Sequence, residues 1–185
     1  MQANAKRERL AQLLRELSLR RGRFRLASGR ESDYYLDCRR TTLSAEGATL
    51  VGELVLAALD RRGWRPAAVG GLTLGADPVA VATAVVSQIS GRPVAAFIVR
   101  KKPKDHGTGR RIEGCPPPGS RVVLVEDVVT TGGSALEAAG ACREAGLEIL
   151  GAVAIVDREE GGREAIEAAG IPLEALFTAS ELLAG

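Results

Sequence analysis

The sequence is 185 residues long, which suits one domain built around a single hydrophobic core. Hydrophobic residues make up 45% of it and charged residues 26%, proportions that exclude the intrinsically disordered and fibrous classes. The net charge of +2 does not indicate a nucleic-acid partner, and no apolar run is long enough to span a membrane.

The first 43 residues differ in character from the rest of the chain. Residues 1–21 have the pattern of one amphipathic helix and lack the apolar core of a signal peptide, so we expect a cytoplasmic protein. Residues 22–40 have the composition of short strands and turns, with a bend at Ser28 and Gly29. Together these segments predict a small N-terminal hood over the remaining structure.

Four apolar runs rich in β-branched residues follow at nearly equal spacing. They cover residues 67–72, 94–99, 121–129 and 149–157. Because the runs are continuously apolar rather than alternating, both faces of each strand should be covered by other elements. This pattern is typical of a mostly parallel sheet.

Helical patterns fill most of the intervals between these runs. They cover residues 44–62, a segment that starts near Asp77, and residues 134–145 and 160–169. We expect Asp77 as the N-cap of its helix and Pro78 as the first helical residue. The alternation predicts an α/β fold with a mostly parallel central sheet flanked by helices. Residues 44–185 would form the core of a single domain that spans residues 1–185.

The interval at residues 100–118 has no helical pattern. It is rich in cations and glycines and ends in three prolines. A long polar loop is uncommon inside a compact domain and is often an active-site lid. A solvated surface loop, or a hairpin arm of extra strands, explains the same composition.

Residues 122–134 have the clearest pattern of a ligand-binding site in the sequence. A buried strand delivers the adjacent acids Glu126 and Asp127, and the hydroxyl- and glycine-rich stretch 130–134 then opens a helix. Amides and hydroxyls at a helix start form a cradle for a phosphate monoester, which glycines allow to approach closely. Acids beside such a cradle suit a sugar phosphate whose hydroxyls bind the carboxylates, with a divalent ion nearby. The P-loop pattern is absent, and the alternative is an ordinary strand, turn and helix with incidental acids.

The same segment satisfies the phosphoribosyl pyrophosphate signature of type I phosphoribosyltransferases. Residues 100–114 resemble the mobile catalytic loop of orotate phosphoribosyltransferases, in which an Arg-Lys pair is followed by Lys-Asp-His-Gly. Residues 24–37 resemble the N-terminal orotate segment of those enzymes, and residues 156–162 their late Asp-Arg element. By resemblance, the chain is identified as a member of the orotate phosphoribosyltransferase family.

The resemblance implies a reaction, a cofactor and an assembly. The phosphoribosyl group of phosphoribosyl pyrophosphate would pass to orotate, giving orotidine 5'-monophosphate and pyrophosphate in UMP biosynthesis. Mg²⁺ would be bound mainly through substrate and water, without a dedicated set of protein ligands. The protein would be a homodimer in which residues 100–118 close over the active site of the neighbouring subunit.

The resemblance also implies roles for particular residues. Lys101, Lys104, His106 and Asp127 would be catalytic. The substrate-binding residues would be Arg100, Glu126, Asp127, Val128, Val129, Thr130, Thr131, Gly132, Gly133, Ser134, Arg158, Ser28 and Tyr35. Within that set the two acids bind ribose hydroxyls, residues 130–134 bind the 5-phosphate, and Arg100 joins the lid cations at the pyrophosphate. Arg158 hydrogen-bonds the orotate, while Ser28 and Tyr35 line the pyrimidine pocket.

Two positions depart from the family pattern. Many relatives carry lysine where this chain has Ala27, and a second lysine near the turn at residues 71–75 is also missing. Backbone amides around Leu72, Thr73 and Gly75 are the expected replacement for binding pyrophosphate, because a glycine-rich turn can present them.

Other interpretations of these residues stay open. A purine or uracil phosphoribosyltransferase would share residues 122–134 but lack the combination of lid and N-terminal segment found here. A non-catalytic regulator that binds phosphoribosyl pyrophosphate would usually need a DNA-binding domain or an extended basic face, and the first 21 residues are too short for a winged helix. His106 could be an ordinary exposed loop residue, and Tyr34 and Tyr35 ordinary strand aromatics. Three widely spaced cysteines and one histidine argue against a disulfide framework or zinc site.

Overall fold

The computed structural model describes residues 2–25, 31–102, 111–114 and 116–185. Its central sheet has six strands in the order β5-β4-β3-β6-β7-β8. In that order the strands span Ile112–Glu113, Ala95–Val99, Ala68–Leu72, Arg121–Val129, Glu148–Asp157 and Leu173–Thr178. β5 pairs antiparallel with β4, and all other neighbours pair parallel. The predicted mostly parallel sheet is confirmed, and the four predicted runs are β3, β4, β6 and β7.

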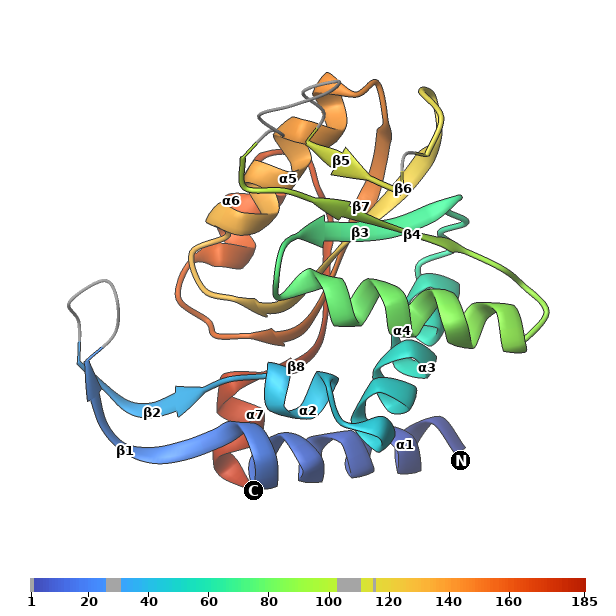
Figure 1. The fold of residues 1–185 in the computed structure, drawn as a ribbon. Helices are drawn as coiled ribbons and strands as arrows, with labels where there is room; N and C mark the ends of the chain where they lie inside the picture. Colours follow the sequence, from blue (N-terminus) through green and yellow to red (C-terminus); the bar gives the residue numbers. More distant parts are fainter. Residues whose placement is uncertain (1, 26–30, 103–110, 115) are drawn as a thin grey trace.

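Helices cover both faces of this sheet (Figure 1). α3 (Ala45–Arg61) and α4 (Ala76–Ile89) pack on one face, and α5 (Gly133–Glu144) and α6 (Gly162–Ala168) lie on the other. Adjacent strand residues join different cores: Val125 packs on the side of α3, whereas Leu124 packs on the side of α5. Successive strand side chains point to opposite faces, so a sheet covered on both sides requires the continuous apolar runs found in the sequence.

Two helix starts show how local chemistry sets the bounds of the elements. Ser44 caps α3, and its Oγ accepts a hydrogen bond from the Gly47 N–H at 3.1 Å. The expectation for α4 is wrong by two positions, since the helix begins at Ala76 with Gly75 as its N-cap. Asp77 instead accepts a hydrogen bond from Thr73 Oγ1 at 2.7 Å. Pro78 is tolerated because N–H groups of the first turn have no partner within the helix.

The N-terminal region departs from prediction within its first 21 residues. α1 (Gln2–Leu13) passes into a π-helical turn (Leu14–Ser18), and β1 (Leu19–Arg25) begins where the sequence still favours helix. The prediction of one helix over residues 1–21 therefore holds as far as Ser18 and is wrong for residues 19–21. Residues of β1 pair antiparallel with β2 (Glu31–Leu36), and this tertiary pairing overrides local helix propensity.

The N-terminal elements and the last helix form a layer along one side of the molecule (Figure 1). α7 (Ala179–Ala184) follows β8 and is held to α1 by Arg7, which donates to Leu176 O at 3.0 Å and to Glu181 at 2.9 Å. The guanidinium groups of Arg15 and Arg21 donate to backbone carbonyls of α7. Segments from the two ends of the described chain thus support each other. Neither β8 nor α7 was expected from the sequence.

Part of the interval 100–118 forms a hairpin arm. β5 pairs antiparallel with the end of β4, and Arg100 N–H donates to Arg111 O at 2.8 Å. The described ends of the interval therefore match the hairpin alternative that its composition left open. Among the described residues, no helix combines the length and the apolar character needed to cross a bilayer.

Candidate active site

The strand order creates a crevice at the carboxyl ends of β3 and β6. β3 and β6 are neighbours, but the chain continues outward to β4 on one side and to β7 on the other. Ligands of open α/β sheets bind at such a switch point, outside the carboxyl ends of the strands. β3 ends there at Leu72 and β6 ends there at Val129.

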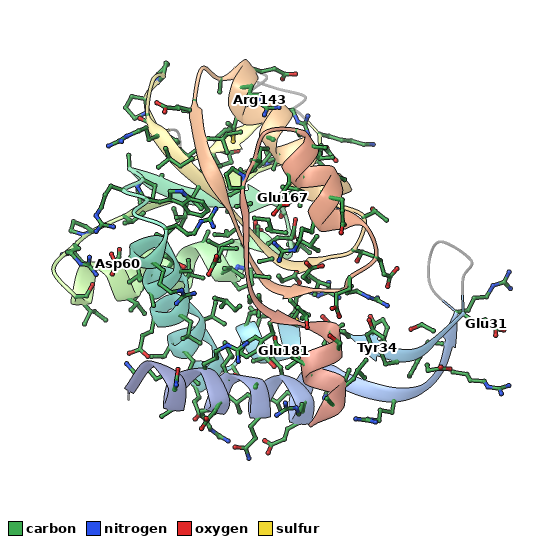
Figure 2. The ribbon with its side chains drawn as sticks, turned by 180° about the vertical axis from the view of Figure 1, so that it is seen from behind. Glu31, Tyr34, Asp60, Arg143, Glu167 and Glu181 are labelled. Carbon is green, nitrogen blue, oxygen red and sulfur yellow. The ribbon has the colours of Figure 1, made fainter. Side chains whose placement is uncertain are left out.

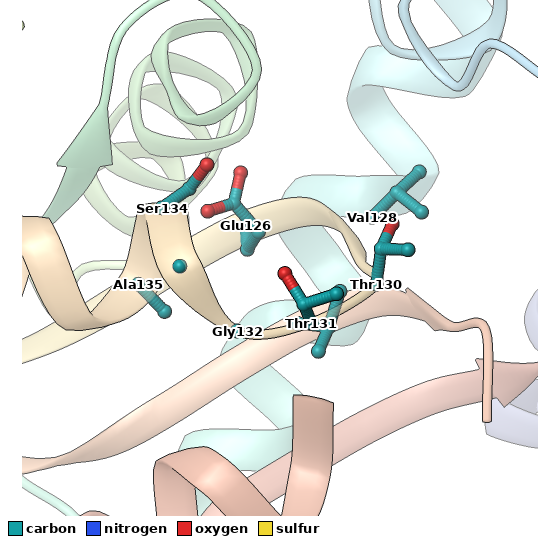
Figure 3. A pocket seen from close by; sticks show the side chains of 9 residues that line it. Glu126, Val128, Thr130, Thr131, Gly132, Ser134 and Ala135 are labelled. Carbon is teal, nitrogen blue, oxygen red and sulfur yellow. The ribbon is translucent and has the colours of Figure 1, made fainter. Parts of the chain in front are cut away.

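The turn after β6 encloses a small pocket of about 80 Å³ at the start of α5 (Figure 3). The residues that line it are Glu126, Val128, Val129, Thr130, Thr131, Gly132, Gly133, Ser134 and Ala135. Gly132 is the N-cap of α5 and has a φ of 82°, in the left-handed region that favours glycine. The first N–H groups of α5 and the nearby hydroxyls supply donors suited to an anion. The structure thus brings residues 128–134 together with Glu126, as the sequence analysis expected.

Glu126 is largely withdrawn from water. The residue is 7% exposed, and its Oε2 is buried without a hydrogen-bond partner among the described residues. Burial, followed by the negative charge of Asp127, raises the pKa of Glu126 to about 8. An unpartnered carboxyl oxygen in a pocket indicates a ligand that donates a hydrogen bond or carries positive charge.

Asp127 faces the turn that follows β3. Its Oδ1 accepts a hydrogen bond from the Val128 N–H at 2.9 Å, and a Cβ atom on Gly75 would overlap the same carboxyl group. Burial raises the pKa of Asp127, while the bond from Val128 and the charge of Arg39, at the start of α2 (Arg39–Thr42), limit that rise. Glycine at position 75 therefore lets the turn approach the acid closely.

The acid pair fits a divalent cation. Carboxylate oxygens are the ligands that Mg²⁺ prefers, and Glu126 offers one that is buried and unpaired. Mg²⁺ takes about six ligands in octahedral geometry, so two carboxyl groups would leave most positions to substrate and water.

The turn between β3 and α4 carries the backbone amides that were expected to take the place of the missing lysines. Its Thr73 N–H donates to Val99 O at 2.9 Å, so the expectation is wrong for that amide and stays a prediction for Leu72 and Gly75. The peptide bond between Thr73 and Leu74 is cis, and Leu74 is 67% exposed. Through Gly75 the turn nevertheless borders the acid pair.

Arg100 and Lys101 follow β4, beside the same turn. Arg100 is half-exposed with its Nη1 atom 3.5 Å from Glu113 Oε1, and Lys101 is exposed. Val99 precedes them and accepts a hydrogen bond from the Thr73 N–H, so the backbone of this segment adjoins the turn next to the acids, while the Arg100 side chain lies toward β5. The predicted site residues Lys104, His106 and Ser28, and the departure at Ala27, lie outside the described residues.

Arg158 directly follows β7 and adjoins the pocket of α5. Its N–H donates to Val129 O at 2.9 Å, which places its backbone beside the turn at residues 130–132. Its side chain is 8% exposed, and its Nη2 atom lies 2.8 Å from Glu160 Oε1. The guanidinium carbon lies 4.8 Å from the ring centroid of Tyr34, within the range of a cation–π contact.

The two tyrosines of β2 have different surroundings. Tyr35 is 41% exposed and packs against Phe24, with ring centroids 5.6 Å apart, and its place in a pyrimidine pocket stays a prediction. Tyr34 was not among the predicted site residues, although it is the one that contacts Arg158. Along β2 the less exposed positions alternate and include both Tyr34 and the buried Leu36. Taking Leu36 as the apolar reference of a period-two pattern would have selected Tyr34 from the sequence.

Comparisons with known proteins place this arrangement in a family. A model of the phosphoribosyl transferase domain matches residues 53–169. The orotate phosphoribosyltransferase of Aquifex aeolicus is 52% identical over 180 residues, which cover 96% of this chain and 97% of that protein. The chain belongs to the orotate phosphoribosyltransferase family. The orotate phosphoribosyltransferase of Bradyrhizobium diazoefficiens is 48% identical, with 99% of each chain covered.

Solved structures of orotate phosphoribosyltransferases share the fold. The enzyme of Mycobacterium tuberculosis in complex with Fe(III) dicitrate is 46% identical and superposes with a TM-score of 0.86, covering 96% of this chain and 98% of that one. Another structure of that enzyme, in complex with phosphoribosyl pyrophosphate, is 42% identical with a TM-score of 0.81 and the same coverage. The family prediction made from residues 24–37, 100–114, 122–134 and 156–162 is thus confirmed.

The raised pKa of Glu126 makes stability depend on pH. Since this pKa moves from 4.5 to about 8, the native state holds a proton that the unfolded state releases between these values. Stability should therefore fall as pH rises through this window, by roughly 1 kcal/mol per pH unit. Glu126→Gln removes the titrating group and should remove that part of the fall, which urea unfolding between pH 5 and 9 measures.

Glu148→Gln is the matched control, because Glu148 is an exposed carboxyl at the start of β7. Its stability should follow the wild-type pH profile. If the wild type and Glu126→Gln lose stability equally between pH 5 and 8, Glu126 is not the buried acid described above.

Proposed function

We propose that the protein transfers the phosphoribosyl group of phosphoribosyl pyrophosphate to orotate, forming orotidine 5'-monophosphate and pyrophosphate in UMP biosynthesis. The observation that carries this proposal is the buried acid pair beside the anion pocket of α5. A pocket with amide and hydroxyl donors suits a phosphate, and adjacent carboxyl groups suit sugar hydroxyls. Membership of the orotate phosphoribosyltransferase family supports orotate as the acceptor.

The substrate would bind with its two ends on different parts of the crevice. The 5-phosphate would accept hydrogen bonds from the turn at residues 130–134, and the ribose hydroxyls would donate to Glu126 and Asp127. In the reaction N1 of deprotonated orotate forms a bond to C1 of the ribose, and the bond from C1 to the pyrophosphate oxygen breaks. The leaving pyrophosphate takes the electron pair of that bond.

Charge development explains the surrounding residues. Positive character grows on the ribose and is opposed by the carboxylate of Asp127, and by that of Glu126 once a bound cation has displaced its proton. Negative charge grows on the leaving group, where Arg100 and Lys101 at the end of β4 would oppose it together with Lys104 and His106. A preorganised charge of this kind is worth about 3 kcal/mol of barrier when a single contact is removed. Mg²⁺, bound mainly through substrate and water, would meet the protein at Glu126 and Asp127, and it would supply positive charge that opposes the negative charge of the leaving group.

We also propose that residues 1–185 act as one domain in the cytoplasm, where phosphoribosyl pyrophosphate and orotate are metabolites. Residues 1–43 would serve as a hood and residues 100–118 as a mobile loop. Purine or uracil transfer, and ligand binding without turnover, are the competing functions. No described feature favours either of them over orotate transfer.

The substrate assay separates these functions. Purified protein with Mg²⁺ and phosphoribosyl pyrophosphate should consume orotate, followed by the loss of its ultraviolet absorbance, and release one pyrophosphate per turnover. Hypoxanthine, adenine and uracil should stay unchanged. Consumption of one of these bases with orotate left intact, or binding without release of pyrophosphate, would refute the proposal.

Asp127→Asn tests the acid pair directly. Replacing the carboxylate should lower kcat by on the order of a hundredfold, because the positive character of the ribose loses a buried counter-charge. Circular dichroism should show an intact fold. Asp60→Asn is the control, since Asp60 lies near the amino ends of β3 and β4 (Figure 2) and pairs there with Arg92 on the surface. Equal activity of Asp127→Asn and the wild type would remove Asp127 from the mechanism.

We further propose that α4 forms the centre of a homodimer interface. Val81, Val85 and Ile89 share one face of α4 and are 51%, 54% and 81% exposed. Leu74 and Leu43, at 67% and 73%, line an apolar groove continuous with that face. An apolar surface of this kind marks an interaction site, and it adjoins the turn beside Asp127. A second copy seated there would bring its own residues 100–118 to the crevice, as the family resemblance implies.

Val85→Glu should disrupt this dimer, because it places a charge at the centre of the apolar face. Sedimentation velocity should show a dimer for the wild type and a monomer for the variant at equal concentration. Gln12→Glu adds a charge to the exposed side of α1 and should stay dimeric. A dimeric Val85→Glu would place the interface elsewhere.

A further inference from the structure

The guanidinium of Arg158 is held by two residues to which no role has been given so far. Glu160 lies 2.8 Å from its Nη2 atom, and this carboxylate and the arginine side chain are only 17% and 8% exposed. The ring of Tyr34 covers one face of the guanidinium at 4.8 Å. The guanidinium of Arg158 therefore contacts Glu160 through Nη2 and the Tyr34 ring through its planar part.

Another part of the guanidinium is left without a hydrogen-bond partner by the residues that the structure describes. Arg158 Nε is buried and has no hydrogen-bond partner among the described residues. Buried donors of native proteins are almost always paired, so an unpaired one that is more than nine-tenths buried indicates an acceptor supplied by a ligand. The backbone of Arg158 adjoins the turn at residues 130–132, so its side chain starts from the edge of the crevice that holds the acid pair.

The loop that carries Arg158 is fixed on both sides. Asp157 accepts hydrogen bonds from Glu159 N–H and from Arg163 Nε, both at 2.9 Å. Glu159 has a positive φ of 60°, and its carboxylate accepts from Ser180 N–H at 2.9 Å and Ser180 Oγ at 3.0 Å, next to the start of α7. Hydrogen bonds from residues other than Glu160 thus fix the backbone of this loop. The ion pair between Glu160 and Arg158 therefore acts on the orientation of the guanidinium rather than on the backbone.

Tyr34 is connected to α7 as well, through β1. It pairs with Arg21 of β1, and the Arg21 guanidinium donates to Leu183 O of α7. Tyr34 lies where the hairpin of β1 and β2 approaches the body of the molecule, whereas Glu31 lies near its outer tip (Figure 2). The hairpin of β1 and β2 therefore places the Tyr34 ring against the Arg158 loop, and both are held by α7.

We propose that Glu160 and Tyr34 are positioning residues that hold the Arg158 guanidinium with its Nε edge directed at the anionic pyrimidine. This inference rests on the proposed function and extends it to two residues outside the predicted site. The carboxylate of Glu160 binds Nη2 and prevents the group from rotating, and the Tyr34 ring prevents it from tilting. The remaining donors then meet the carboxylate or carbonyl oxygens of orotate without a prior loss of side-chain freedom.

Glu160→Gln tests the ion pair with little change of shape. The KM for orotate should rise roughly tenfold, because a guanidinium that rotates meets the base in the wrong geometry, while the KM for phosphoribosyl pyrophosphate stays near the wild-type value. Glu167→Gln is the matched control. Glu167 is an exposed carboxyl on α6 (Figure 2) that pairs with Arg163 at 3.3 Å, and its loss should change neither constant.

A double-mutant cycle shows whether Glu160 acts through Arg158. In the Arg158→Lys background, which lacks the planar group, Glu160→Gln should raise the orotate KM no further. Additive effects would overturn the proposal, as would equal increases of both KM values in Glu160→Gln. An unchanged orotate KM in Glu160→Gln would also overturn it.

The tyrosine offers a second route in case Glu160→Gln does not fold. Tyr34→Phe keeps the ring and should keep the wild-type orotate KM, whereas Tyr34→Leu should raise it roughly tenfold. Equal values for the two variants would refute the role of the ring. A wild-type protein that fails to consume orotate would instead refute the proposed function, so the two failures are distinguishable.

Discussion

The structure depends on keeping two adjacent carboxyl groups out of water at the end of β6. Removing a carboxylate from water is unfavourable unless hydrogen bonds or opposite charge replace the lost hydration. The raised pKa of Glu126 is the direct sign of this deficit, because the lowering effects on the pair, from backbone amides such as that of Val128 and from the charge of Arg39, do not offset the burial. The site is thus built to be completed by a ligand that brings hydroxyl donors and positive charge.

The same requirement accounts for small residues around the crevice. A Cβ on Gly75 would overlap Asp127, and a Cβ on Gly162 would lie 2.6 Å from Thr130 O. Gly132 needs its left-handed backbone to start α5 directly after the turn. Turns from β3, β6 and β7 therefore meet closely enough to enclose the acids and the anion pocket together.

The sequence predicted the parts of the fold that depend on local patterns. β3, β4, β6 and β7 were recognisable because strands buried on both faces must be apolar throughout, and residues 122–134 because strand, acids, glycines and helix follow each other without a gap. Short strands were expected from residue 22, but the start of β1 at Leu19 was missed because an arginine-rich segment suits an exposed ribbon and a helix surface equally well. Its conformation is decided by pairing with β2, which no local pattern reveals. The sequence did not predict the contacts of Arg158 with Tyr34 and Glu160 for a similar reason. Tyr34 reaches the arginine through the packing of the hood on α7, which is a tertiary contact.

The attachment of both the hood and the Arg158 loop to α7 bears on how the protein is made. A ribosome synthesises residues 179–184 after every other helix and strand of the described chain. Until they emerge from the exit tunnel, Arg7, Arg15 and Arg21 lack their carbonyl partners, and Glu159 has no Ser180 to hold. The acid pair and its turn can form earlier, but the hood gains its full support only at that late stage. The contacts that tie the hood and the Arg158 loop to α7 are therefore among the last that the described chain can make during its synthesis.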